Sequence, residues 1–382
     1  MKKVFVTLLV LACMGVEMFG QAEAPINNPI LTGVPALTIA PDARATGMGD
    51  VGVATAPDVN SQYWNPAKYA FMESPFGFGL SYTPWLRKLQ LNDIYLAYVA
   101  GYYKLGERQA ISASVRSFSM GGITTVDVWG QPGITVQPNE FAVDLAYSMQ
   151  LSAKLSAAVS LRYLVTDLGN GAAVGSSSAY YAGSTGAADV SVYYKTPITM
   201  ETGESKLALG LCVSNLGGKV SYDKGQNTNF IPSNMRFGGS FEMPMDAYNK
   251  ITVSADFNKL LVPTPTFVYG DSASLNNVSA IDGIFKSFEV GPGGMSEKLR
   301  EIAWGSGLEY SYNNQFFVRG GYRHESQYKG NRKYYTAGAG FKLNVFQLDV
   351  SYIIAVAPTN PLDQTLRFSL SFDMFGIKNL AD

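Results

Sequence analysis

The feature that most constrains this chain is a strict alternation of apolar and polar side chains in many short segments. Between residues 141 and 150, for example, Phe141, Val143 and Leu145 alternate with Ala142 and Asp144. Successive side chains of a β-strand point to opposite faces, so this period of two predicts a strand with one apolar face. Fourteen segments show the pattern, at residues 76–82, 94–102, 111–115, 141–150, 155–163, 190–194, 207–213, 235–241, 251–257, 302–310, 316–322, 335–343, 346–354 and 366–372. The sequence therefore predicts an all-β chain.

The connections between these segments alternate in length. Those after odd-numbered segments are long and rich in Gly, Ser, Asn or Pro, as at residues 119–139, 166–187, 217–233, 258–301 and 324–333. Those after even-numbered segments are short, as at residues 104–109, 152–154, 313–314 and 344. Outer-membrane barrels combine short periplasmic turns with long outer loops. The observed order of long and short connections agrees with this rule if the first strand starts in the periplasm. We therefore expect a 14-stranded antiparallel transmembrane β-barrel in the outer membrane, over residues 76–373.

Composition favours a barrel over a helical membrane protein. Charged residues make up 15% of the chain, against about 25% in an average soluble domain, and aromatic residues 13%. Mean hydropathy is nevertheless +0.03, because strands that alternate apolar and polar residues average out. No later segment is long and apolar enough for a transmembrane helix. The net charge of −1 gives no reason to expect a nucleic-acid partner.

The N-terminus predicts export. Two lysines precede an apolar run at residues 4–13, so we interpret residues 1–22 as a signal peptide cleaved after Ala22. The alternative is lipoprotein processing at Cys13, which would leave an unusually short leader. After cleavage at Ala22, Cys212 is the one remaining cysteine, so we expect no disulfide within the mature chain.

Ten charged side chains fall on the polar phase of the predicted strands. They are Arg116, Asp144, Arg162, Arg236, Asp256, Glu309, Arg319, Arg323, Asp349 and Arg367. Facing lipid at the midplane, an Arg or Lys would cost about 2–4 kcal/mol, so we expect these side chains to face the lumen. Two interpretations stay open: a charged conduit, or a lattice of ion pairs and hydrogen bonds that holds the lumen wall and its contents.

Residues 23–75 precede the first predicted strand and do not alternate. Pro25, Pro29 and Pro35 open an extended arm, and a Gly-rich stretch follows at residues 40–54. A Gly-x-Gly run can bind phosphate, but only between a strand and a helix of a βαβ unit, which the pattern does not contain. We therefore interpret the segment as a plug that threads the lumen.

The same segment carries a family resemblance. The run at residues 43–54, followed by Tyr-Trp-Asn-Pro-Ala at 63–67, resembles the N-terminal hatch of the FadL-like outer-membrane barrels, and residues 39–68 as a whole are similar to the PorV family. The last strand extends the resemblance, although many such barrels end on an aromatic residue and here a tail at 374–382 follows. The expected hatch residues are Arg44, Gly47, Gly49, Asp50, Gly52, Trp64, Asn65 and Pro66.

The resemblance also implies a function. PorV-like proteins are outer-membrane components of the type IX secretion system of Bacteroidota, and they are not themselves the translocation pore. They associate with the giant translocon barrel, receive cargo by its C-terminal signal domain, and shuttle it to a cell-surface attachment complex. A sortase-like protein of that complex joins the cargo to lipopolysaccharide. The expected partners are therefore outer-membrane lipid, the translocon barrel, attachment-complex proteins and cargo signal domains, with no cofactor or metal.

Aromatic residues in the predicted outer loops exceed what a solvated loop needs. The candidates for partner contact are Trp129, Phe230, Phe267, Tyr269, Phe285 and Phe288. Buried aromatic side chains dominate interface energetics, which favours partner binding by these loops. The alternative is that the loops fold inward as a lid over the barrel.

Two other functions are alternatives. His324, the one histidine of the chain, lies in a predicted outer loop and is the candidate base of a lipid A deacylase, an activity associated with this family. A solvated loop residue is the simpler interpretation of His324, and we expect no enzyme. A FadL-type transporter of apolar small molecules would instead require a path through the hatch, which a sequence does not reveal.

Overall fold

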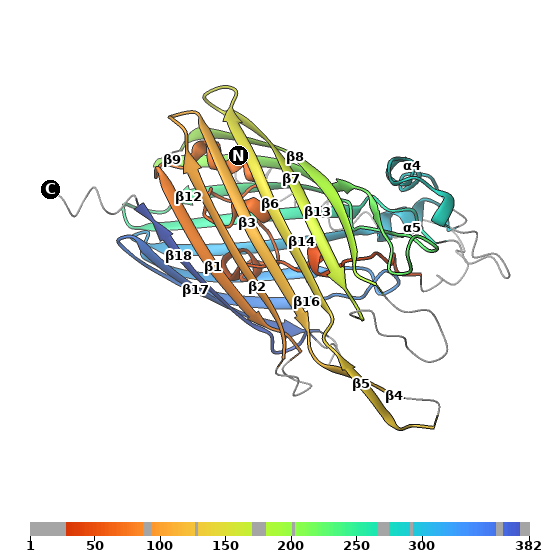
Figure 1. Ribbon diagram of the computed structural model, residues 1–382. Coiled ribbons are helices and arrows are strands. Elements are labelled where there is room, and N and C mark those ends of the chain that lie inside the picture. The colour runs from red at the N-terminus through yellow and green to blue at the C-terminus, as the bar shows by residue number, and fades with distance from the viewer. Residues whose placement is uncertain are drawn as a thin grey trace.

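A closed ring of fourteen antiparallel strands forms the body of the protein (Figure 1). The computed structural model describes residues 28–86, 93–126, 129–169, 181–200, 203–265, 275–290, 293–356 and 362–374. The ring strands are β1 (Phe76–Pro84), β2 (Ile94–Lys104), β3 (Gln109–Met120), β6 (Asn139–Gln150), β7 (Leu155–Asp167), β8 (Gly183–Met200), β9 (Gly203–Gly217), β12 (Asn234–Pro244), β13 (Asn249–Leu260), β14 (Ile302–Tyr312), β15 (Phe316–His324), β16 (Tyr334–Leu343), β17 (Phe346–Ala355) and β18 (Leu366–Asp373). The predicted 14-stranded antiparallel barrel is confirmed, and each predicted segment lies within one of these strands.

Pairing of the first strand with the last closes the ring. In the register of β1 and β18, Gly77 lies opposite Asp373 and Tyr82 opposite Phe368. Closure gives every ring strand two hydrogen-bonded neighbours, so its backbone groups are paired without water, as a bilayer requires. β8 is much longer than its predicted core at 190–194, because its ladder of backbone pairs with β7 and β9 continues where the side chains no longer alternate.

Most ring strands bury their polar phase and expose their apolar phase. On β6 and β7, Leu145 and Leu161 are 63% and 65% exposed, whereas the adjacent Asp144 and Arg162 are buried. A soluble protein shows the reverse pattern. Exposed apolar side chains suit an outer face that meets hydrocarbon, and the buried charges face the lumen.

β2 departs from this rule because it is apolar on both faces. Its predicted apolar face, with Leu96, Tyr98 and Tyr102, is buried inside the barrel, while Val99 on the other phase is 42% exposed. Tyr102 stacks on Tyr69 of the interior segment, with ring centroids 5.2 Å apart. A lumen filled by chain accepts apolar side chains, and alternation alone does not show which of two apolar faces meets lipid.

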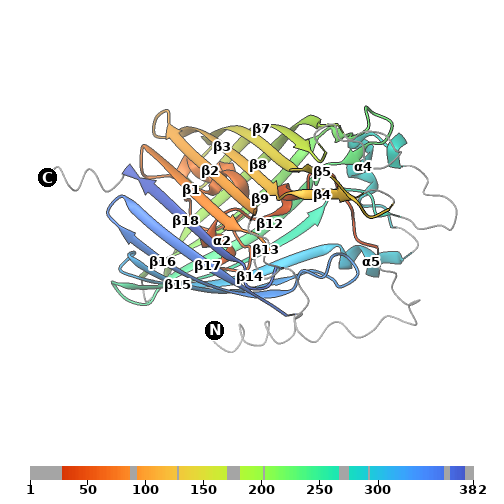
Figure 2. The same ribbon diagram turned by 60° about the horizontal axis from the view of Figure 1, so that its bottom comes forward.

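Short turns and long loops lie at opposite ends of the barrel, which we call the turn end and the loop end (Figure 1). At the turn end, Asn313, Asn314 and Asn344 adopt positive φ angles of 53°, 52° and 50°, as tight hairpins require. The rule that outer loops are long predicts that the loop end faces the outside of the cell. The loop-end elements are β4 (Ile123–Val126), β5 (Pro132–Val136), β10 (Lys219–Val220), β11 (Asn229–Phe230), η4 (Leu275–Asn277), α4 (Ala280–Lys286) and α5 (Gly294–Arg300). Figure 2 shows β4, β5, α4 and α5 at this end.

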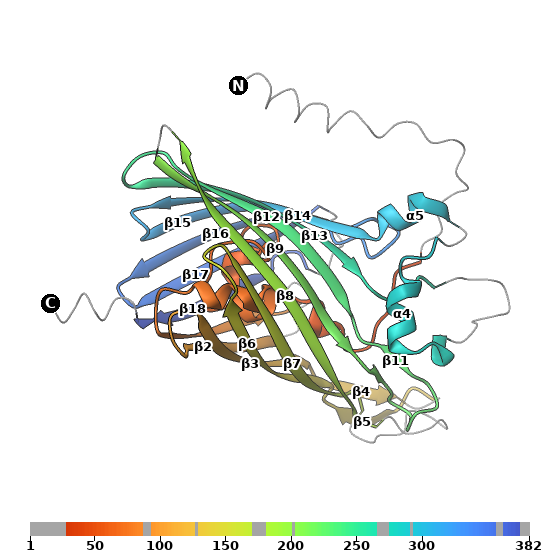
Figure 3. The same cartoon turned by 90° about the horizontal axis from the view of Figure 1, so that it is seen from above.

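Most of residues 28–75 lie inside the ring, and the first few described residues lie at its loop end (Figure 3). The short helices of residues 28–75 are η1 (Pro35–Thr38), α2 (Ala43–Thr46), α3 (Ser61–Trp64) and η2 (Pro66–Phe71). α2 packs against β16, β17 and β18, and η2 packs against β3, β6, β7 and β8, so this interior segment bridges the lumen. In the described ranges, no helix is long and apolar enough to cross a bilayer.

The direction of the interior segment differs from the simplest expectation. β1 does begin at the turn end (Figure 1), but residue 28 contacts the loop after β15, which lies at the loop end. There the backbone N–H of Asn28 donates to the carbonyl of Tyr328, at 3.2 Å. The chain therefore runs down the lumen from the loop end to the turn end before the first strand starts.

Candidate functional site

A buried hydrogen bond between Trp64 and Asp42 lies at the centre of the interior segment. Asp42 caps α2, where its Oδ2 accepts the backbone N–H of Ala45 at 2.9 Å. Its Oδ1 accepts the indole N–H of Trp64, the last residue of α3, at 2.6 Å. Trp64 is 2% exposed. The carboxylate thus ties two separate helices together and receives the donors that a buried charge needs.

Glycines allow the interior segment to touch the wall and itself. A Cβ on Gly49 would lie 2.6 Å from the carbonyl oxygen of Tyr322 on β15, and the φ of Gly49 is +76°. A Cβ on Gly52 would lie 2.3 Å from the ring of Trp64. Gly47, at the end of α2, lies against Gly338 of β16. These predicted hatch glycines are therefore positions of close contact.

Arg44 on α2 connects the interior segment to a buried charge network of the wall. Its Nη1 lies 2.8 Å from Asp58 Oδ2, and its Nε lies 3.3 Å from Glu309 Oε2. Arg319 lies 2.6 Å from both Glu309 and Asp349. Two guanidinium groups and three carboxylates therefore alternate across α2, β14, β15 and β17.

Two further carboxylates hold the glycine-rich stretch. Asp50 accepts a hydrogen bond from the Tyr334 hydroxyl and lies 3.7 Å from Arg367 Nη1. Asp256 Oδ2 on β13 accepts the backbone N–H of Gly52 at 2.8 Å. A charged acceptor from the wall thus pairs with backbone donors that would otherwise be buried without partners.

Asn65 and Pro66 shape the turn between α3 and η2. Asn65 Oδ1 accepts the backbone N–H of Ala67, and Pro66 occupies the first position of η2. The amide of Asn65 also donates to the carbonyls of Val53 and Val192, each at 3.0 Å. One side chain therefore joins η2, the glycine-rich stretch and β8.

Arg162 forms a second network within the wall itself. Its Nε lies 2.5 Å from Asp144 on β6, and its Nη2 lies 3.0 Å from Asp189 on β8. Nη1 donates to the side-chain oxygen of Asn215. The guanidinium is thus satisfied by groups of β6, β8 and β9.

Three of the ten predicted lumen charges differ from the other seven in their pairing. Arg116, Arg236 and Arg323 make no ion pair within the ranges that the structure describes, whereas the other seven pair with an opposite charge or with backbone N–H groups. Nine of the ten are buried, and Arg323 is half-buried. The paired majority supports the lattice interpretation over an open conduit.

Some contributors carried no recognisable sequence signal. Lys68 is fully buried, and its Nζ donates to the carbonyl of Gly52 at 2.9 Å and to Thr55 Oγ1 at 3.2 Å. Tyr63 lies between two arginines of the wall. The sequence around Lys68 and Tyr63 does not alternate, so no pattern shows which of its side chains are buried. For Asp42 a signal exists, because Asp is a favoured residue at a helix N-terminus and Asp42 precedes Ala43.

The loop-end aromatic candidates that the structure describes differ in how far they are exposed. Trp129, Phe285 and Phe288 are 82%, 70% and 52% exposed. Phe267 and Tyr269 lie outside the described residues. Large exposed aromatic side chains at the outer end are what a partner-binding loop provides.

Phe230 does not fit the prediction of a partner-contacting side chain. It is only 7% exposed, because α4 covers its ring. A Cβ on Gly283 of α4 would lie 2.4 Å from that ring, and Lys219 Nζ lies 4.4 Å from its centroid. Phe230 thus supports α4 from below instead of presenting itself to a partner.

A buried cluster of charges anchors α5 to the barrel. Glu301 Oε2 lies 2.8 Å from Lys259 Nζ of β13, and its Oε1 lies 3.3 Å from Lys298. Burial raises the pKa of Glu301, but the hydrogen bonds from Lys259 and Thr264 and the nearby lysine charges outweigh it, so this pKa lies below its usual value. The carboxylate is therefore held in its charged form.

The N-terminal end of the interior segment joins the same region. Lys329 Nζ lies 2.8 Å from Glu297 Oε1 of α5 and donates to Asn28 Oδ1 at 2.7 Å. Asn28 Nδ2 also donates to Glu297 Oε1. Burial raises the pKa of Glu297, yet the hydrogen bonds from Lys329 and Asn28 bring it below its usual value. Asn28 thus links the interior segment to α5.

His324 is the last residue of β15 and not part of an outer loop. Its ring stacks on Trp304 with 5.4 Å between centroids, and its Nδ1 lies 3.4 Å from the Tyr322 hydroxyl. These three residues share the phase of the exposed Leu308 and Val318. The group has the position of an aromatic belt at a membrane interface.

The family model described as "Type IX secretion system protein PorV" matches residues 22–267. No curated protein sequence matches.

Several solved structures are similar in fold at low identity. The toluene transporter TbuX of Ralstonia pickettii is 13% identical, with 87% of this chain and 98% of that chain covered and a TM-score of 0.48. A FadL homologue of Pseudomonas aeruginosa is 10% identical, with 91% and 99% covered and a TM-score of 0.46. The toluene transporter TodX of Pseudomonas putida is 9% identical, with 90% and 98% covered and a TM-score of 0.49. The family model covers more than half of the chain, and the chain therefore belongs to the PorV family of type IX secretion system proteins, in the outer membrane.

Proposed function

We propose that this protein receives secreted cargo by its C-terminal signal domain from the translocon barrel and passes it to the cell-surface attachment complex. Membership of the PorV family supports a role in type IX secretion. The surface of the loop end supports the more specific role of an adaptor that binds protein partners.

The observation that carries the proposal is a set of exposed apolar side chains on and around α4 and α5. This α4–α5 patch consists of Ile281, Phe285, Phe288, Val290, Met295 and Leu299, each more than half exposed. Ile281 and Phe285 lie one turn apart on α4, as Met295 and Leu299 do on α5, so each pair shares one helix face. Exposed apolar side chains on two helices at one end of the barrel are typical of a protein interaction site.

Packing and ion pairs hold both helices of the patch in place. Phe230 packs beneath Gly283 of α4, and the ion pairs of Glu301 and Lys329 hold α5. A preorganised apolar surface loses less conformational entropy on binding than a loop that must first become ordered. This support favours docking over a lid that closes onto the barrel.

The contents of the lumen favour an adaptor over a conduit. The interior segment is joined to the wall by hydrogen bonds and ion pairs along its length. A cavity between that segment and the wall measures about 70 Å³. Small-molecule sites usually measure about 300–1,000 Å³, so this cavity gives no support to the transporter alternative.

The test is a double substitution in the patch, Ile281→Asp with Phe285→Asp. Two buried charges in the contact would weaken docking, so the variant should lose co-purification with the translocon barrel and leave cargo with C-terminal signals in the periplasm. Barrel abundance should stay normal, because both side chains are exposed.

The matched control is Met245→Asp in the turn after β12, an exposed apolar residue at the opposite end of the barrel. It should secrete normally. Normal secretion by the patch variant beside a defective null strain would make the patch assignment wrong. Normal secretion by the null strain itself would make the adaptor role wrong.

A further inference from the structure

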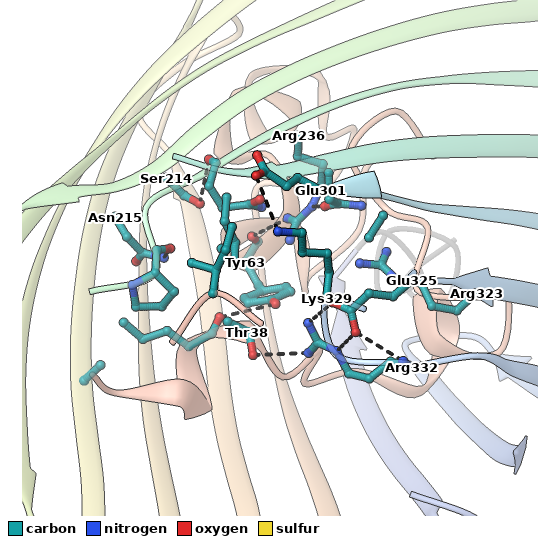
Figure 4. A pocket seen from close by; sticks show the side chains of 18 of the residues that line it. Thr38, Tyr63, Ser214, Asn215, Arg236, Glu301, Arg323, Glu325, Lys329 and Arg332 are labelled. Carbon is teal, nitrogen blue, oxygen red and sulfur yellow. Dashed lines mark hydrogen bonds and ion pairs between the residues drawn. The ribbon is translucent and has the colours of Figure 1, made fainter. Parts of the chain in front are cut away.

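A cavity near the loop end separates the interior segment from the wall (Figure 4). We call it the Tyr63 cavity, after the residue of α3 whose ring lines it. Its volume of about 70 Å³ holds a few water molecules or one small ion, and not an alkyl chain. Arg116 of β3, Arg236 of β12 and Arg323 of β15 also line it, and so approach it from three parts of the ring.

Two of these arginines lie against the same aromatic ring. The Cζ atom of Arg116 lies 4.7 Å from the Tyr63 ring centroid, and that of Arg236 lies 5.1 Å from it. Stacking on an aromatic ring fixes the plane of a guanidinium group while leaving its N–H edges free to donate. Tyr63 therefore positions two cationic groups at the wall of one small cavity.

The hydrogen-bond partners of these two arginines are neutral oxygens. Arg116 Nη1 donates to the carbonyls of Ala36 and Ile39, at 2.6 and 3.1 Å. Arg236 Nε donates to Asn258 Oδ1 at 2.8 Å, and its Nη1 donates to the Tyr63 carbonyl at 3.3 Å. None of these contacts supplies a negative charge.

Two buried donors in the lining have no protein partner. They are Nη2 of Arg116 and Nδ2 of Asn258, and their side chains belong to residues that are 5% and 8% exposed. Arg323 makes no hydrogen bond or ion pair within the described ranges. An unpaired buried donor is costly, and more so when it carries charge, so these groups together call for an acceptor.

The acidic residues of the lining do not supply that acceptor. Asp144 is paired with Arg162, and Glu325 is paired with Arg332 at 2.8 Å. Glu301 is engaged by Lys259. The lining holds six cationic side chains (Arg116, Arg162, Arg236, Arg323, Lys329 and Arg332) and three anionic ones, which gives an excess of three positive charges.

Two carboxylates near the cavity bond to the interior segment through one oxygen each, while Glu140 Oε1 and Asp256 Oδ1 have no hydrogen-bond partner in the described residues. Glu140 Oε2 accepts the backbone N–H of Ala36, and Asp256 Oδ2 accepts that of Gly52. Neither lies within 4.0 Å of a guanidinium nitrogen of Arg116 or Arg236. The positive charge at the cavity therefore has no direct protein counter-charge within the described part of the chain.

We propose that the Tyr63 cavity binds a phosphoryl group. Guanidinium groups bind phosphate oxygens through paired N–H donors. A tetrahedral oxyanion accepts hydrogen bonds from several directions at once, which suits donors placed around the cavity, as those of Arg116, Arg236, Arg323 and Asn258 are. The excess charge excludes a cation, and the small volume excludes a fatty acid bound by its chain. This site goes beyond the adaptor role and does not depend on it.

The phosphoryl group has two possible sources. Ile30, Lys329 and Arg332 place the cavity beside the loop end, where free phosphate and the phosphates of an outer-leaflet glycolipid are both within reach. The chemistry recognised is the same in both cases. The experiment therefore tests each source separately.

The test measures thermal unfolding of the purified full-length protein in detergent. Inorganic phosphate is titrated against chloride of equal ionic strength, and a phosphorylated glycolipid is compared with its dephosphorylated form. A ligand of the folded state raises the unfolding midpoint with concentration. Saturable stabilisation by phosphate assigns a free ion, and stabilisation by the phosphorylated lipid alone assigns a lipid; both support the site.

Three variants complete the test. Arg236→Lys and Arg116→Lys keep one charge and lose the fork of donors, so each should weaken phosphate binding by about tenfold or more. Lys206→Gln, an exposed residue of β9, should bind as the wild type does. Equilibrium dialysis of radiolabelled phosphate with the wild type alone keeps the test decisive if a variant fails to fold.

Four outcomes would overturn the proposal. They are an absence of saturable binding to the wild type from either source, equal stabilisation by acetate and phosphate, undiminished binding by both lysine variants, and equal weakening by Lys206→Gln. The second outcome would show that the cavity recognises charge and not the phosphoryl group.

Discussion

The indole nitrogen of Trp64 and the Oδ1 atom of Asp42 lie 2.6 Å apart, inside the barrel and between two separate helices. Trp64→Phe removes the donor together with the five-membered ring of the indole, so it also leaves a small cavity. We expect the barrel to lose at least about 1.5–3 kcal/mol of stability, the range for hydrogen bonds to charged groups. The measurement is the temperature at which the folded, fast-migrating form disappears on a gel.

Trp129→Phe is the control for that substitution. Trp129 is 82% exposed, so its change should stay within about 0.5 kcal/mol. Equal shifts for the two variants would contradict the structural role of the Trp64 bond.

The direction of the interior segment makes a topological prediction. Leu31 is 78% exposed and lies near the loop end, whereas Met245 is 52% exposed and lies in a turn at the other end. On intact cells, a membrane-impermeant maleimide should label Leu31→Cys and leave Met245→Cys unlabelled. The native Cys212 is buried and gives little background. Labelling of Met245→Cys alone would reverse the assigned orientation.

The carboxylates of Glu297 and Glu301 make the packing of α5 sensitive to acid. Both pKa values lie below the ordinary 4.5. A depressed folded-state pKa stabilises fully above the unfolded value and loses that contribution as the pH falls through the folded one. Hydrogen exchange in α5, corrected for its intrinsic pH dependence, should therefore be constant from about pH 8 to 5 and faster below about 4.5.

The matched variant for the acid response is Glu297→Gln with Glu301→Gln. It should show weaker protection of α5 at neutral pH and a flatter response to acid, because no carboxylate remains to be neutralised there. Protection that increases on acidification of the wild type would refute the sign of this argument.

Gly49 is predicted to tolerate no side chain. In Gly49→Ala the new Cβ would lie 2.6 Å from the Tyr322 carbonyl, and the positive φ adds strain. We expect a clear fall in the yield of folded barrel. Gly130→Ala is the control, since Gly130 has a similar φ of +80° with open space around it. Strain alone should cost it only about 1 kcal/mol, so similar yields of the two variants would show that the wall contact is unimportant.

The strands were predictable because one face of each had to suit hydrocarbon. That requirement produces the alternation at Phe141, Val143 and Leu145, and the membrane's two sides produce the alternation of loop lengths. β2 is the exception, since Tyr98 and Tyr102 belong to its predicted apolar phase and nevertheless face the lumen. A period of two identifies the two faces of a strand but does not show which face meets lipid.

The interior segment was harder to predict in detail. Its position inside the wall followed from prolines and glycines ahead of the first strand, but no sequence pattern pairs Asp42 with Trp64 or Lys68 with Gly52 within that segment. The contact between Tyr63 and Arg236 of the wall joins residues 173 positions apart. No local pattern encodes such pairs.

The passage of the interior segment along the lumen has a consequence for biogenesis. Once β1 and β18 are paired, the ring offers no sideways opening through which residues 28–75 could enter. Threading them lengthwise afterwards would drag Arg44 and Lys68 past a wall of fixed charges. The less costly order of assembly places the interior segment among the strands before β18 pairs with β1. Pairing of this last strand would then enclose the segment.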